Sequence, residues 1–83
     1  MSVCKVLFFA TLKDRAGVRQ TTLELPDGVT VCQLKTIIRD KFPSLSSVLT
    51  IALIAVNREY ALDDDLIPPE AEIALFPPVS GGS

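Results

Sequence analysis

The 83-residue chain is long enough for one small domain and too short for two. Apolar residues make up 48% of it, which supports a hydrophobic core, yet no apolar run approaches the roughly 18 residues that span a bilayer. The net charge of −2 and the scattered cations argue against nucleic-acid binding. The N-terminus lacks the pattern of a signal peptide, so we expect a cytoplasmic protein with no membrane partner.

The only sulfur nucleophiles are Cys4 and Cys32, and the chain has no histidine. Two thiols are too few for a disulfide scaffold or an iron–sulfur cluster, and no imidazole can complete a zinc site. We therefore expect reduced cysteines that pack as small apolar side chains, and no metal site.

The first half of the chain predicts two paired strands. Residues 3–10 are β-branched, aromatic and nearly all apolar, which favours a central strand buried on both faces. Residues 11–16 predict a short helical turn that Gly17 ends with a left-handed conformation. Residues 20–25 alternate like an outer strand, and 26–28 are turn residues. We expect the two strands to be antiparallel.

A helix follows from residue 30 onward. Thr30 and Gln33 have the spacing of a capping box, in which each side chain accepts a hydrogen bond from the backbone N–H of the other residue. Pro43 predicts the end of the helix, because the residue before a proline resists helical geometry. Apolar residues recur at helical spacing at Val31, Leu34, Ile38 and Phe42.

The second half predicts three more strands after a Ser-rich connection. Residues 51–57 are apolar and bounded by polar residues, which fits a central strand, and Asn57-Arg58 predicts a turn. Residues 59–62 predict a short edge strand, and 72–76 predict the last strand. The three aspartates at 63–65 are interpreted as a solvated turn, since a hard cation needs more oxygen ligands.

This order of elements predicts the α+β class. A mixed sheet of about five strands would curl over one main helix, leaving its other face partly bare, which is the β-grasp or ubiquitin-like arrangement. We assign residues 1–77 to this domain and 78–83 to a flexible C-terminal tail that carries Gly-Gly.

Aromatic residues near the strand ends are candidate partner contacts. Phe8, Phe9 and Phe76 alternate between the faces of their strands, so at least one should enter the core and another should point to the bare face. We take Phe8 and Phe76 as candidates for docking a partner, with ordinary packing as the alternative.

The tail is the main functional candidate. Pro77 and Pro78 cannot donate ladder hydrogen bonds, so the sheet should end there and the chain should project outward. Gly81 and Gly82 carry no side chain to obstruct a narrow channel, which suits delivery of a carboxyl group to another protein's active site. A frayed terminus has the same composition, and composition alone leaves that alternative open.

Several blocks of residues, in this order and spacing, resemble the small, sulfur-carrying subunit of molybdopterin synthase over essentially the whole chain. They are Lys5–Ala10, the Leu12–Gly17 turn, the Ala55-Val56-Asn57-Arg58-Glu59 element and the tail Phe76-Pro77-Pro78-Val79-Ser80-Gly81-Gly82. In that family the terminal glycine carboxylate, here Gly82, is adenylated and then thiocarboxylated. It afterwards gives its sulfur to cyclic pyranopterin monophosphate.

The resemblance also implies partners for this chain. They are a large synthase subunit, in a heterotetramer of two small and two large subunits, an E1-like adenylyltransferase that uses ATP, and a sulfurtransferase or cysteine desulfurase. The residues from Pro77 to Ser80 would contact the partner beside Gly81 and Gly82. The chain itself would be a non-catalytic sulfur donor with no bound cofactor, and the catalytic residues would lie on the large subunit.

Two positions depart from the family pattern. Family members end at the second glycine, so we expect Ser83 to be removed before activation or to be an addition from expression. Glu70-Ala71 stands where the family has Gly-Asp, which bears on the turn before the last strand. Two other functions would use the same tail: a ubiquitin-like protein modifier, and a sulfur carrier for thiazole synthesis or tRNA thiolation.

Overall fold

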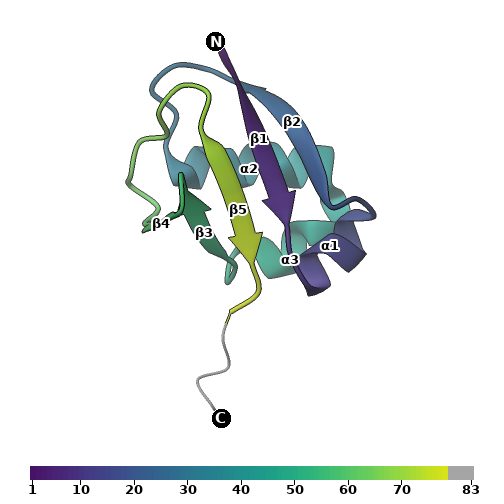
Figure 1. The fold of residues 1–83 in the computed structure, drawn as a ribbon. Coiled ribbons are helices and arrows are strands. Elements are labelled where there is room, and N and C mark those ends of the chain that lie inside the picture. Colours follow the sequence, from purple (N-terminus) through teal and green to yellow (C-terminus); the bar gives the residue numbers. More distant parts are fainter. Residues whose placement is uncertain (79–83) are drawn as a thin grey trace.

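The computed structural model describes residues 1–78 of the chain (Figure 1). The described elements are, in chain order, β1 Ser2–Phe8, α1 Thr11–Ala16, β2 Gln20–Leu25, α2 Val31–Lys41, the 3₁₀ helix η1 Pro43–Leu45, α3 Ser46–Leu49, β3 Leu53–Val56, β4 Glu59–Ala61 and β5 Glu72–Phe76.

The five strands form one mixed sheet in the order β2-β1-β5-β3-β4 (Figure 1). Strand β1 is antiparallel to β2, as predicted, and parallel to β5. Strand β5 is antiparallel to β3, which forms a hairpin with β4. Strand β5, the last strand among the described residues, is therefore the central strand of the sheet, held by hydrogen bonds along both sides.

Helix α2 covers one face of the sheet, and the core lies between these two layers (Figure 1). Val31, Leu34 and Ile38 are its buried residues, so the predicted apolar stripe is confirmed. The sheet contributes alternate residues, among them Cys4, Val6 and Phe8 of β1 and Ile73 and Leu75 of β5. We call the opposite side of the sheet the open face. This is the predicted α+β, ubiquitin-like β-grasp arrangement.

The N-terminus of α2 has a partner for each of its first four backbone N–H groups. The predicted capping box is present: Gln33 N–H donates to Thr30 Oγ1 at 3.2 Å, and Thr30 N–H donates to Gln33 Oε1 at 2.9 Å. The backbone carbonyls of Asp65 and Asp63 accept from Val31 and Cys32, and Leu34 bonds back to Thr30. The three-aspartate turn thus ties the end of β4 to the start of α2.

Positive φ angles mark three of the turns. Gly17 ends α1 at φ 79° with its N–H on the Lys13 carbonyl, as predicted. Asn57 and Arg58, at 52° and 71°, form the predicted two-residue turn between β3 and β4. Glu70, at 56°, lies where the family resemblance leads one to expect glycine. A side chain therefore occupies a left-handed position there.

Two expectations need correction. Strand β1 was expected to be buried on both faces, but Val3 is 54% exposed and Lys5 is also exposed, because no element among residues 1–78 covers the open face. The Ser-rich connection contains η1 and α3. Pro43 ends α2 and then occupies the first turn of η1, where a missing N–H costs nothing.

Candidate functional site

Strand β5, the central strand, ends where the tail begins, at one end of the sheet. β5 ends at Phe76, and its Leu75 carbonyl accepts a hydrogen bond from Phe9 N–H at 3.1 Å. On its other side Phe76 is opposite Leu53 of β3. The residues that lead into the tail therefore start from a rigid base.

Three aromatic side chains gather on the open face at this end of the sheet. The ring of Phe76 stacks on Phe9 with centroids 4.7 Å apart, and Tyr60 of β4 approaches Phe76 edge-on at 6.4 Å. Phe9 is 40% exposed and Tyr60 is 75% exposed. We call these three residues the aromatic patch. Phe76 between Phe9 and Tyr60 is half-buried, so the three rings form one contiguous, partly exposed group, and such groups are typical of protein-binding surfaces.

Phe8 does not belong to this patch, so its assignment as a partner contact is corrected. Its side chain is 2% exposed and packs edge-to-face on Phe42 in the core, with ring centroids 5.2 Å apart. Phe9 takes the position on the open face that was expected for Phe8. The sequence did contain a sign of this arrangement at Lys5. A charged residue indicates that the odd-numbered side of this strand is exposed, and Phe9 lies on the same side.

The structure describes Pro77, the last residue assigned to the domain, and Pro78, the first residue of the tail. Pro77 is half-buried directly after Phe76, and Pro78 is exposed. The predicted functional residues Val79, Ser80, Gly81 and Gly82, and Ser83 after them, lie outside the described residues.

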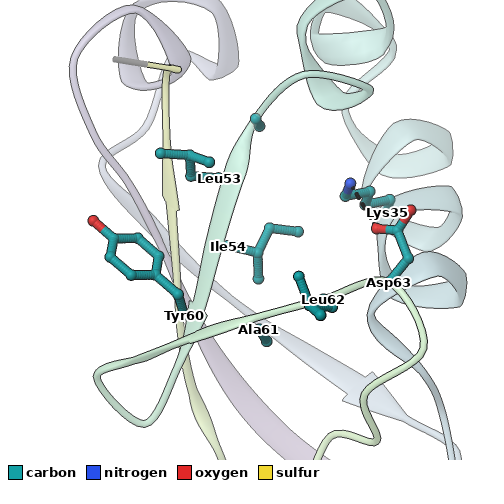
Figure 2. A pocket seen from close by; sticks show the side chains of 8 residues that line it. Lys35, Leu53, Ile54, Tyr60, Ala61, Leu62 and Asp63 are labelled. Carbon is teal, nitrogen blue, oxygen red and sulfur yellow. Dashed lines mark hydrogen bonds and ion pairs between the residues drawn. The ribbon is translucent and has the colours of Figure 1, made fainter. Parts of the chain in front are cut away.

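A groove of about 530 Å³ lies beside β4, and Tyr60 is one of the residues that line it. Figure 2 shows Leu53, Ile54 and Ala61 along it, with Lys35 and Asp63 side by side at one end. Lys35 Nζ is 2.9 Å from Asp63 Oδ1. The two charged residues that line this groove among residues 1–78 are therefore paired with each other.

The described part of the chain holds no cluster of side chains suited to a metal ion. Within residues 1–78, no three Cys, Asp or Glu side chains are placed to hold a metal ion. Cys4 is buried and Cys32 is exposed, and both are free thiols. None of the described helices is long and apolar enough to cross a membrane. What these residues do present is the aromatic patch, at the end of the sheet where the tail begins.

Comparison with known proteins agrees with this description. The ThiS family matches residues 6–82. An Arabidopsis thaliana protein described as molybdopterin synthase sulfur carrier subunit is 38% identical over 78 residues, which cover 94% of this chain and 81% of the relative.

Two solved structures extend the comparison. The structure of SAMP1 from Haloferax volcanii has a TM-score of 0.84 at 28% identity, covering 98% of this chain and all of that one. A chain in the complex of subunits 1 and 2 of molybdopterin-converting factor from Helicobacter pylori has a TM-score of 0.68 at 22% identity. It covers 96% of this chain and 99% of that one, and at this identity the likeness supports the fold alone. From the family match and the full-length relative, we conclude that the chain belongs to the ThiS family and, within it, to the molybdopterin synthase sulfur carrier subunits.

Proposed function

We propose that this protein is the sulfur carrier of molybdenum cofactor biosynthesis. The observation that supports the proposal most strongly is the central position of β5, which places the start of a Pro-Pro…Gly-Gly tail beside an exposed aromatic patch. The body binds a partner, and the tail carries the reacting carboxyl group. The family relationship agrees with this division.

The proposed loading takes place at the carboxyl group of Gly82. A free carboxylate is a poor electrophile, so it first attacks the α-phosphate of ATP on an E1-like adenylyltransferase, which forms an acyl-adenylate and releases pyrophosphate. The terminal sulfur of a persulfide on a sulfurtransferase or cysteine desulfurase then attacks the acyl carbon and displaces AMP. A thiol reduces the acyl disulfide that results, which releases the thiocarboxylate and leaves a disulfide on the donor. Gly81 and Gly82 have no side chain to hinder this approach.

The proposed delivery takes place in a heterotetramer with two large subunits. The aromatic patch docks on the large subunit, and Pro77, Pro78, Val79 and Ser80 lead the tail into its active site. There the sulfur passes to cyclic pyranopterin monophosphate, and Gly82 returns to a carboxylate that can be loaded again. The large subunit supplies the catalytic side chains, which agrees with the absence of histidine in this chain.

Reconstitution tests this function directly. A chain that ends at Gly82 is incubated with activating enzyme, ATP and a sulfur source, and intact mass measures the exchange of one carboxyl oxygen for sulfur. The loaded protein is then mixed with large subunit and pterin precursor, and the dithiolene product is assayed. A chain lacking Gly81 and Gly82 is the matched control. Verified loading without dithiolene product would contradict the proposal.

Ser83 has its own test in the same system. The full 83-residue chain should be loaded only after Ser83 is removed, because Ser83 otherwise carries the terminal carboxylate. Intact mass distinguishes the two forms. A thiocarboxylated species that retains Ser83 would show that activation does not depend on glycine.

A ubiquitin-like modifier is the second candidate. It is favoured by the likeness to SAMP1, which is a small archaeal modifier protein. Activated Gly82 would then form an isopeptide bond with lysine side chains of other proteins. Conjugates of higher mass that require both the activating enzyme and Gly81-Gly82 would support this function, and their absence under conditions that give dithiolene would exclude it.

A further inference from the structure

A small basic hollow lies on the open face next to the aromatic patch. It has a volume of about 300 Å³, and the residues that line it include Leu7, Phe9, Lys13, Arg19 and Gln20. Phe9 belongs to both the hollow and the patch, so the two surfaces are continuous. Among the described residues that line it, Lys13 and Arg19 are the charged ones.

Both cations of the hollow are exposed, and neither takes part in the ion pairs found among residues 1–78. Their surroundings are basic, since residues 13–19 contain three cations and one carboxylate. In contrast, residues 59–72 contain six carboxylates and no cation. Helix α1 and the end of β5 lie at the same end of the molecule (Figure 1). Although the net charge of the protein is negative, its surface at the end of the sheet where the tail begins is therefore positive.

We propose that this hollow binds a carboxylate side chain of the large synthase subunit, presented next to an apolar side chain that covers Phe9. The inference rests on the proposed function. The apolar base formed by Leu7 and Phe9 would exclude water once covered, which strengthens the attraction between the cations and the carboxylate. The positive surface would also steer the tail end of the carrier toward an acidic region of its partner.

Association kinetics with purified large subunit test this assignment. The variants are Lys13→Glu and Arg19→Glu, with Arg39→Glu as the matched control. Arg39 is an exposed cation of α2, on the opposite side of the sheet, and its reversal changes the net charge by the same amount. We expect either hollow variant to lower the association rate about tenfold or more at low salt, and the loss to shrink at high salt. The control should change the rate less than about threefold.

The outcomes separate this inference from the function on which it rests. If the wild type binds and donates sulfur but the hollow variants and Arg39→Glu have equal effects, only net charge matters and the assigned site is wrong. It is also wrong if the hollow variants lose their effect when residues 79–83 are deleted, since the acid they bind would then be the chain's own terminus. If the wild type does not bind the large subunit at all, the proposed function itself fails.

Discussion

At the scale of single residues, Glu70 stores backbone strain. Its φ of 56° is left-handed, which costs a residue with a Cβ about 1–2 kcal/mol. Glycine removes that cost. It also gives the unfolded chain more conformational freedom, which destabilises the folded state by about 0.5–1 kcal/mol. We therefore expect Glu70→Gly to raise the free energy of unfolding by about 0.5–1 kcal/mol in urea titrations. Glu70→Ala is the control that removes the side chain and keeps the strain, so an equal gain from alanine would contradict the backbone explanation.

Asn57 joins the β3–β4 turn to the first residue of β5. Its N–H donates to the Glu72 carbonyl at 2.7 Å, and its Oδ1 accepts from Glu72 N–H at 2.9 Å. Asparagine also tolerates the left-handed conformation that it adopts here. These contacts give the Ala55-Val56-Asn57 element a structural role, because they hold the β3–β4 turn against the start of β5.

Two substitutions separate the contributions of Asn57. Asn57→Gly tolerates the left-handed conformation and loses only the Oδ1 acceptor of Glu72 N–H. Asn57→Ala loses the same acceptor and is also strained in the left-handed conformation. We expect thermal unfolding to show a loss of about 1 kcal/mol for glycine and about 2–3 kcal/mol for alanine. Equal losses would mean that the left-handed conformation contributes nothing at this position.

At the scale of elements, the start of α2 depends on its capping box. Thr30→Ala removes the acceptor of Gln33 N–H and should lower the free energy of unfolding by about 1 kcal/mol, measured by urea denaturation. Thr30→Ser keeps the hydroxyl and is the matched control, with an expected loss below about 0.5 kcal/mol. Equal losses of stability from both variants would mean that the threonine methyl group, and not the hydroxyl cap, stabilises the start of α2.

Elements with strong local signals could be predicted from the sequence. The bounds of α1, β2 and β5 agree with prediction, and the structure begins α2 right after Thr30. The short helices η1 and α3 could not be predicted, because Ser-rich segments of three or four residues lack helical periodicity and become ordered through tertiary packing. Leu45 and Leu49, which are buried, provide that packing.

At the scale of the whole molecule, the two faces of the sheet have different tasks. The covered face holds the core and stabilises the domain, and the open face carries the aromatic patch and the basic hollow. Strand β1 contributes to both faces, since Cys4, Val6 and Phe8 are buried and its odd-numbered side chains are not. Two adjacent phenylalanines do not themselves reveal which of them faces the helix, because that depends on tertiary packing. Lys5 is a local sign that the odd-numbered side is exposed, and the expectation of a strand buried on both faces gave it no weight. Phe8 was therefore predicted as a partner contact, whereas Phe9 lies in the patch.

The neighbours Phe8 and Phe9 provide the sharpest test of this division. Phe8→Ala opens a cavity in the core and should cost about 3–5 kcal/mol, a large part of the roughly 4–12 kcal/mol available to a domain of this size. Phe9→Ala loses mainly its stack on Phe76, worth about 1 kcal/mol, so the variant should stay folded.

For binding to the large subunit, we expect Phe9→Ala to have the larger effect and Phe8→Ala the smaller one. At a temperature where both variants are folded by circular dichroism, Phe9→Ala should weaken the affinity about tenfold or more, since it removes an exposed aromatic from the centre of the docking surface. Phe8→Ala should bind within about threefold of the wild type, because that side chain reaches no partner. Equal losses of affinity would mean that docking depends on the stability of the whole sheet, and the open face would then have no separate role.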